Sequence, residues 1–485
     1  MLFPRQFSRR LGRACALAVL VIRPAAAVAQ STTVAPTSDT LRLSLGDAVS
    51  IAMRQSDEVG IAAAQVEVAD ALYGSARANT LPQLRFTSSY LHVYNSARGQ
   101  AVGSVFNQPN TYTANLGLQQ TVFQGGRLVS ATRSADRTRE AARFDEREQR
   151  ALLTLQVERA YINVLYSDRI TELQDRNLAL ATTRLTQVEQ FERAGRAARY
   201  DVLRSRVERS NIEPLAIQAR NDRELALVEL KRVLNLPVDQ PVALVTHIDS
   251  AATAALLASV GDTSGIPDRA SVRSAELNLD ARKLSISVAR ADFYPTVSVF
   301  FNSGYQAFPP IGMGFPTSFG GLTEAACPPG GVAGRTCQNG GWFSDRQLGL
   351  NIAFPVFDGF RVKSNLDLAQ AQARLADLEL RQEREQVSVD VARARAELRR
   401  SSAVFAARRQ NSQEADEAFR LATLRFSRGL STQLEVSDAQ LALLTAESTE
   451  ARATYDLFLA AADLARALGR PIPIPSSAGA PTTPR

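Results

Sequence analysis

Two very long stretches of this sequence contain neither glycine nor proline. The first runs from Arg127 to Ala194, and the second from Phe360 to Arg428. Glycine and proline are the residues that most often end a helix, so each stretch is predicted to form one continuous helix. At about 1.5 Å per residue, such a helix would extend roughly 100 Å. Because no globular core is that wide, the helices are expected to pack against one another along their length.

The second stretch carries the spacing of a coiled coil. Apolar or small residues recur in alternating steps of four and three: Val362, Leu366, Ala369, Ala373, Ala376 and Leu380, and then Val387, Val391, Ala394 and Leu398. A period of about 3.5 residues places them on one face of the helix, where small side chains permit close packing. Gly195 and Gly429 follow the two stretches, and a new helical pattern begins directly after each. Each stretch is therefore predicted to be the first arm of a long helical hairpin.

The chain repeats itself. One constant shift along the chain places Gly195 on Gly429 and the segment LKRVLNLP (230–237) on LARALGRP (464–471). The segments LPQLRFTSSY (81–90) and YPTVSVFFNSGY (294–305) align only with a smaller shift, which places Pro82 on Pro295. The second copy is therefore predicted to carry additional residues between its strands. An internal repeat of this length indicates two copies of one structural unit.

Four shorter segments alternate with the two-residue period of β-strands. In 348–356, Leu348 and Leu350 alternate with Gly349 and Asn351, and 116–122 alternates in the same way. Segments of about ten residues, apolar on one face and polar or small on the other, are typical of outer-membrane barrel strands. Taken strand by strand, an ordinary half-buried sheet would give the same pattern. The combination with an export signal and two helices of roughly 100 Å favours the barrel.

The N-terminal segment 1–29 is predicted to be a secretory signal peptide. Four arginines precede an apolar segment from Ala14 to Ile22, and a small-residue cleavage site follows at Ala27 to Ala29. Cleavage after Ala29 removes five arginines and no acidic residue, and the formal charge falls from +7 to +2. The mature chain then has no basic excess that would favour nucleic acid as a partner.

The domain organisation follows from the repeat and the signal. We expect a signal peptide at 1–29, a first structural repeat at 41–237 (helix, two barrel strands and long helical hairpin), a linker at 238–265, a second repeat at 266–471 with an enlarged inter-strand loop at 306–345, and a disordered tail at 472–485. Cys327 and Cys337 lie in the enlarged loop. In an exported protein they are predicted to form a disulfide, and two free thiols are the alternative.

The sequence contains no catalytic pattern. It has two histidines and lacks H-E-x-x-H, C-x-x-C, G-x-S-x-G and Walker-type motifs. A secreted enzyme would need such chemistry, so the protein is predicted not to be an enzyme. No cofactor and no metal site are expected.

The order and duplication of these segments resemble the TolC-like outer-membrane efflux proteins, the outer membrane factors. The resemblance covers about residues 41–471 and includes the segment SRGLSTQLEVSDAQ (427–440). It implies a mainly α fold with a small β part. Long α-helical coiled-coil hairpins form a periplasmic tunnel, and four strands per chain contribute to a shared trimeric 12-stranded outer-membrane β-barrel. Four strands are too few to close a barrel, for which about eight are needed, so the subunits must share theirs.

The resemblance also implies a function and partners. It indicates the exit duct of a tripartite efflux or type I secretion system, located in the outer membrane and extending into the periplasm. The implied partners are two further copies of the chain in a homotrimer, outer-membrane lipid, a periplasmic adaptor (membrane fusion) protein and an inner-membrane pump of the RND, MFS or ABC type. The alternative is a periplasmic coiled-coil adaptor or scaffold of a transport complex, which also has long hairpins but would not need four lipid-facing strands.

Two sets of candidate site residues follow from the resemblance. Glu435 and Asp438, three residues apart on one helical face, match the acids that ring the periplasmic gate in the family. By spacing alone, two such acids on a helix are usually part of a solvated face, and only the resemblance favours the gate. The hairpin tips resemble the family's docking point for the adaptor: Gly195, Arg196, Ala197, Gly429, Leu430 and Ser431.

Overall fold

The computed structural model describes residues 40–102, 110–246, 268–309, 315 and 342–470. The predicted signal peptide, the predicted tail and the two cysteines of the predicted disulfide, Cys327 and Cys337, lie outside the described residues. The predictions made for them are therefore not tested by the structure.

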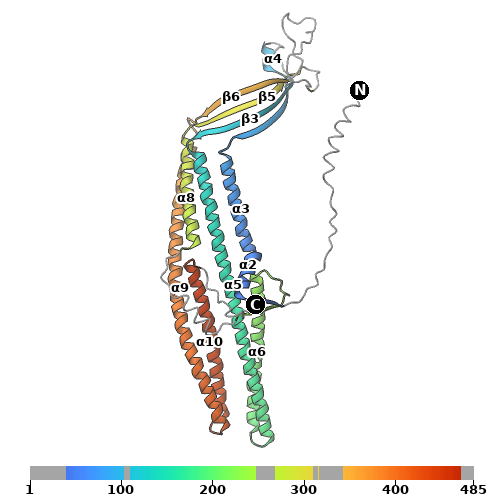
Figure 1. The fold of residues 1–485 in the computed structure, drawn as a ribbon, viewed down its shortest axis with the longest axis vertical. Helices are drawn as coiled ribbons and strands as arrows, with labels where there is room; N and C mark the ends of the chain where they lie inside the picture. Colours follow the sequence, from blue (N-terminus) through green and yellow to red (C-terminus); the bar gives the residue numbers. More distant parts are fainter. Residues whose placement is uncertain (1–39, 103–109, 247–267, 310–314, 316–341, 471–485) are drawn as a thin grey trace, which may run out of the picture.

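The long helices predicted from the sequence are present. Helices α5 (Arg127–Arg193) and α9 (Arg361–Ser427) each contain 67 residues. They are followed by α6 (Arg199–Val233) and α10 (Gln433–Ala467), each of 35 residues. The shift that relates Gly195 to Gly429 also relates the bounds of α5 and α6 to those of α9 and α10. The two hairpins run side by side along the long axis of the molecule (Figure 1).

Shorter helices complete a curved helical layer. They are α2 (Leu45–Gln55), α3 (Asp57–Ala78) and α8 (Ala270–Arg290), which continues into the short helix η2 (Ala291–Phe293). The short helix α4 (Ala97–Val102) lies apart from this layer, at the far end of the strands (Figure 1). In the half nearer the strands the order across the layer is α3, α5, α8, α9, and in the other half it is α6, α5, α10, α9. Helices α3, α6 and α9 therefore form the edges of the layer. None of the helices in the described part of the chain has both the length and the apolar composition needed to cross a membrane.

Four strands form one antiparallel sheet at the end of the helical layer. They are β2 (Gln83–His92), β3 (Asn110–Gln124), β5 (Thr296–Ala307) and β6 (Trp342–Ala353), in the order β2-β3-β5-β6. The sequence pattern extended the last strand to Val356, but β6 ends at Ala353. Pro355 follows two residues later and has no N–H to donate to a neighbouring strand, which explains the earlier end.

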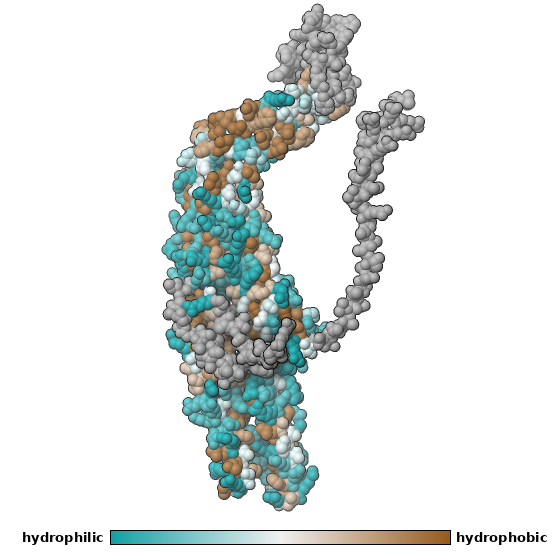
Figure 2. Space-filling model, viewed as in Figure 1, coloured by the Kyte–Doolittle hydropathy of each residue, from teal (hydrophilic) through white to brown (hydrophobic). Residues whose placement is uncertain are grey.

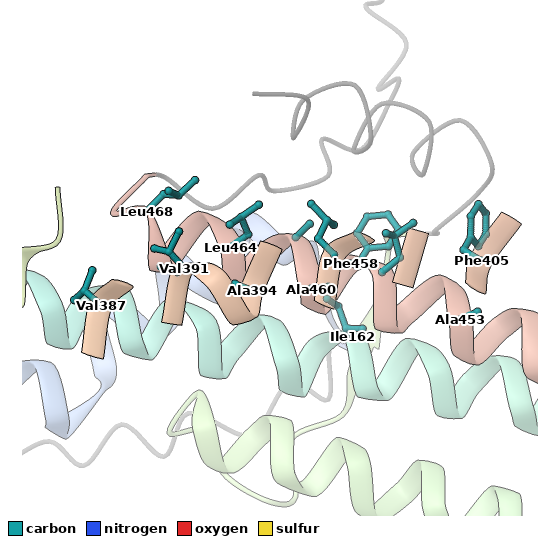
Figure 3. Packing of buried hydrophobic residues seen from close by; sticks show 14 residues of the cluster. Ile162, Val387, Val391, Ala394, Phe405, Ala453, Phe458, Ala460, Leu464 and Leu468 are labelled. Atoms are coloured by element: carbon teal, nitrogen blue, oxygen red, sulfur yellow. The ribbon is translucent and has the colours of Figure 1, made fainter. Parts of the chain in front are cut away.

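The predicted coiled-coil seam is the buried face of α9. Nine of the ten seam residues are buried, and Leu366 is partly buried. The part of this seam from Val387 to Leu398 packs against α10 and α5 (Figure 3). In the same cluster, Leu457 and Ala461 of α10 are fully buried. Five of the fourteen buried residues in this cluster are alanines, which let the helix backbones approach closely where they meet.

A second core forms around a two-stranded parallel sheet. Strand β1 (Leu41–Leu43) pairs in parallel with β4 (Val242–Leu244), which lies within the predicted linker. The buried Tyr161 hydroxyl of α5 donates to the Leu43 carbonyl oxygen at 2.9 Å. The first described residues of the linker thus belong to an ordered core.

A buried ion network ties the middle of the layer together. The Arg269 guanidinium, at the start of α8, donates to Glu148 of α5 at 3.0 Å and to Asp390 of α9 at 2.9 Å. Arg466 of α10 donates to the same Glu148 oxygen at 3.3 Å. Four helices therefore meet at two carboxylates, and removal of one partner would leave a poorly solvated charge.

Candidate functional site: hairpin tips and channel wall

The two hairpin tips, residues 194–198 and 428–432, have the same backbone geometry. Gly195 and Gly429 have φ values of +70° and +75°, a left-handed conformation that favours glycine. The N–H groups of Arg196 and Leu430 donate to the carbonyl oxygens five residues earlier, at 2.7 and 2.9 Å. This is the Schellman arrangement that ends a helix. Both tips are exposed at the end of the molecule opposite the strands (Figure 1).

The predicted gate acids lie in the first two turns of α10, beside the second tip. Glu435 occupies the third position of the helix, where its N–H donates to the Thr432 hydroxyl at 3.4 Å. Its carboxylate lies 3.9 Å from the Arg425 guanidinium, and both side chains are about half exposed. Asp438 is exposed and makes no ion pair within the described part of the chain. The structure thus brings both acids to one exposed helix face beside the second tip.

A polar cluster lies behind these acids, on the opposite face of α10. The Arg184 guanidinium of α5 donates to Ser437 Oγ and to Gln440 Oε1, both at 2.8 Å. Gln440, which is 6% exposed, donates in turn to Asn177 Oδ1 at 2.8 Å. Burial lowers the pKa of Arg184, and Glu208 at 3.4 Å opposes this shift. The acid-bearing turn of α10 is therefore fixed to α5 by directional bonds.

Sequence reasoning missed this polar cluster. Arg184 and Gln440 are 256 residues apart in the chain, and no local motif connects them. One signal was available: Gln433, Val436 and Gln440 are spaced by three and four residues, so Gln440 occupies a position where an apolar residue would be expected. A buried polar residue in such a seam requires a partner.

The convex face of the sheet is apolar. Along one register the strands place Leu84 beside Leu118, Phe301 and Leu348. Leu348, Leu350 and Ile352 of β6 are 78%, 59% and 62% exposed. Figure 2 shows this apolar surface over the strands, next to the hydrophilic surface of the helices. An exposed apolar band of this kind suits contact with lipid.

The concave face of the same sheet is polar. Arg85, Asn115 and Asn302 line it, in a concavity of about 580 Å³. The edges of the sheet, β2 and β6, have no strand partner among the described residues. Unpaired backbone groups at a lipid-facing edge are costly, so both edges require strands from elsewhere. The alternative of a periplasmic adaptor does not explain these strands.

The fold is that of a TolC-like channel subunit: two long helical hairpins and a four-stranded sheet with an apolar convex face. The profile of the outer membrane efflux protein family matches residues 48–236 and 267–470, and the chain belongs to this family. It is an outer-membrane protein that serves as an exit duct for efflux. No group of three or more His, Cys, Asp or Glu residues that could hold a metal ion occurs in the described part of the chain.

Individual relatives agree with this assignment. The chain is 27% identical over 443 residues to the pyoverdine export outer membrane protein OpmQ of Pseudomonas putida, covering 88% of this chain and 85% of that protein. It is 23% identical over 448 residues to the outer membrane efflux protein BepC of Brucella suis, covering 92% and 90% of the two chains. The crystal structure of VceC from Vibrio cholerae superposes with a TM-score of 0.70 at 20% identity, covering 88% of this chain and 97% of VceC.

Proposed function

We propose that three copies of this chain form one continuous duct, with a shared barrel in the outer membrane and a helical tunnel in the periplasm. The observation that carries this proposal is the open sheet: four strands end in two edges, β2 and β6, that have no strand partner among the described residues. Three such sheets joined edge to edge would close a barrel and leave no unpaired edge in lipid.

The edges of the helical layer support the same assembly. Ile61, Val68 and Leu72 on α3 are each about 60% exposed in the single chain and are spaced by seven and four residues. On α9, at the opposite edge, Leu368 and Leu375 are 57% and 56% exposed and seven residues apart. Such spacing is that of coiled-coil seams without a partner. Edge helices of neighbouring copies would bury both seams.

The duct would operate with two further proteins. An inner-membrane pump of the RND, MFS or ABC type would supply the substrate, and a periplasmic adaptor would join the pump to the duct at the exposed hairpin tips. The first tip carries Arg196, whose guanidinium lies 5.1 Å from the Phe191 ring. A cation at this tip favours an adaptor surface that contains acidic residues. The second tip, with Leu430 67% exposed, offers an apolar contact.

In the resting duct, Glu435 and Asp438 of three copies would converge at the periplasmic end. Like charges in a narrow space repel one another and favour cations between them. The polar cluster around Arg184 would hold each α10 in this closed position. Release of that cluster would allow the second hairpin to move outward and the duct to open. The two relatives are named for pyoverdine export and for efflux, and small molecules are the cargo class we propose for this chain.

Insertion of the purified protein into planar bilayers tests the barrel. The wild-type protein is expected to give discrete, cation-selective conductance steps. Replacement of Leu348 and Leu350 with lysine places two charges on the lipid face. Each charge destabilises the inserted barrel by about 2–4 kcal/mol near the bilayer centre, so the variant should fail to insert. The matched variant carries lysine at Gln347 and Asn351 on the concave face and should still insert. Equal insertion of both variants would contradict the assignment of the convex face to lipid.

A further inference from the structure

The concave face of the four strands is almost free of charge. Its residues are mostly amides, hydroxyls and glycines, among them Asn115, Gln119, Asn302 and Asn351. In the described strands, Arg85 of β2 is the one cation on this face, and Asp345 of β6 is the one anion. A single cation on a neutral polar surface dominates the local potential, because nearby opposite charges do not cancel it.

The two charged groups differ in their surroundings. Asp345 accepts hydrogen bonds from Gln306 at 2.9 Å and from Gln347 at 3.2 Å. Arg85 is exposed and makes no ion pair in the described part of the chain. The two residues are three strands apart in the sheet, about 14 Å at ordinary strand spacing, and belong to different registers. The Arg85 guanidinium therefore remains available to an anion that enters the concavity.

An aromatic ring lies on the same face. Phe300 of β5 pairs with Gly349 of β6, and a Cβ atom added to Gly349 would lie 2.4 Å from the Phe300 ring. The ring thus lies across the glycine, in space that any side chain at this position would fill. Arg85 and Phe300 line the same concavity of about 580 Å³.

Ordinary strand geometry sets the distance between these two groups. Arg85 lies two strands away from Phe300, about 10 Å across the sheet. Along the strand direction the two residues are offset by two positions, about 7 Å. Together these offsets give roughly 12 Å between their Cα atoms. The Phe300 ring leans over Gly349 toward β6, so the flexible Arg85 side chain and the bound molecule must together span the concavity. A ring that stacks on Phe300 can therefore present a carboxylate to the guanidinium, which binds carboxylates in a bidentate manner.

We propose that the concave face of the sheet is a contact site for small aromatic anions, in which Arg85 binds the acidic group and Phe300 stacks on the ring. The proposal rests on the proposed function, in which this face lines the exit path. It names the class of compound that would bind to the wall of the duct during export. Saturated acids would lose the stacking contact, and aromatic amines would meet the cation of Arg85.

Fluorine NMR of fluorobenzoate, titrated with the full-length protein in neutral detergent, tests the site. Addition of wild-type protein is expected to broaden the fluorine resonance in a saturable manner. Arg85→Gln should weaken the apparent affinity about tenfold, as expected for loss of one charge-assisted contact. Phe300→Leu should weaken it about threefold, as expected for loss of one aromatic contact. Gly349→Ala, which displaces the ring, should also weaken it.

Matched controls lie on the convex face of the same strands. Arg346→Gln and Phe301→Leu remove the same side-chain types from the lipid side and should leave binding unchanged. Fluorobenzylammonium and a fluorinated cyclohexanecarboxylate should bind more weakly than fluorobenzoate. Equal binding by wild type, Arg85→Gln and Phe300→Leu would overturn the site and assign the signal to the micelle.

Light scattering on the same samples separates this inference from the assembly. A trimer that does not bind fluorobenzoate would overturn the contact site and leave the duct intact. A monomer with Arg85-dependent binding would support the contact site, because one chain lines the concavity, and would contradict the duct.

Discussion

Arg184 on α5 and Gln440 on α10 are joined by a hydrogen bond of 2.8 Å, although they are 256 residues apart in the chain. Gln440 also donates a hydrogen bond to Asn177 of α5. The oxygen and the nitrogen of this one buried amide therefore both bind α5. Gln440 is two residues from Asp438, at the end of the molecule where the duct is expected to be narrowest. The bond between Arg184 and Gln440 is therefore one of the contacts that fix the acid-bearing turns of α10 to α5.

Replacement of Arg184 with methionine should loosen this coupling. Gln440 Oε1 and Ser437 Oγ would lose the hydrogen bonds from Arg184, and a buried polar group left unpaired costs about 1–3 kcal/mol. We expect faster amide hydrogen exchange in the first turns of α10 and a larger single-channel conductance. Arg204→Met, at an exposed arginine of α6, is the control and should change neither. Unchanged exchange and conductance in Arg184→Met would show that the cluster does not hold the hairpin.

The acids themselves can be tested by removal of their charge. In the double variant Glu435→Ala, Asp438→Ala, six carboxylates disappear from the proposed trimer while the buried seam is untouched. Single-channel recordings should show loss of block by trivalent cations, with conductance at least equal to that of wild type. The variant Glu414→Ala, Asp416→Ala removes two exposed acids of α9 and should retain the block. Persistent block in the first variant would place Glu435 and Asp438 on a solvated outer face.

The helices could be predicted from the sequence because their determinants are local. The absence of glycine and proline defined α5 and α9, and Gly195 and Gly429 defined the turns. Strand positions were predicted as well, but the end of β6 was wrong by three residues because apolar alternation continues past the point where Pro355 ends the pairing. Strand β4 was missed because three apolar residues carry no period, and its partner β1 lies at the other end of the first repeat.

The gate acids and the tips were predicted by resemblance, and their roles remain predictions. The cluster around Arg184 could not have been predicted from local pattern, because its bonds depend on how two distant hairpins pack. The division into two repeats and a linker also stays a prediction, although the bounds of the long helices repeat with one constant shift.

A buried acid makes stability depend on pH. Glu158 on α5 is 2% exposed, and neither carboxylate oxygen has a hydrogen-bond partner in the described part of the chain. Burial raises the pKa of Glu158 to about 8, and repulsion from the nearby Asp463 carboxylate contributes to the same shift. The folded state then holds a proton that the unfolded state has released above about pH 4.5. Its contribution to stability is fully present at low pH and is lost as the pH rises toward and through 8.

Glu158→Gln should remove this dependence. Between the two pKa values the free energy of unfolding of the wild type falls by about 1.4 kcal/mol per pH unit from this group alone. The variant should therefore unfold at a higher temperature than the wild type at alkaline pH and at a similar temperature in mild acid. Glu224→Gln, at an exposed position of α6, provides the control. A constant difference between Glu158→Gln and wild type at all pH values would contradict the raised pKa.

The loop between β5 and β6 contains the two cysteines of the predicted disulfide. Cys327 and Cys337 would close a short segment that lies outside the described part of the chain. Mass spectrometry of non-reduced peptides from envelope-derived protein should detect the disulfide. Closure of a loop of this size contributes about 3 kcal/mol in the chain-entropy account. Detection of both cysteines as free thiols would refute the pairing.

The central claim is that the open sheet and the unpartnered edge helices are completed by two further copies of the same chain. The mass of the protein, extracted by detergent from isolated outer membranes, can be measured by light scattering after the contribution of the detergent is subtracted. The account predicts a protein mass of three chains. A Leu375→Glu variant should form this species less stably, because it places a charge in the exposed seam of α9. A stable, folded monomer recovered in the soluble fraction would contradict the account.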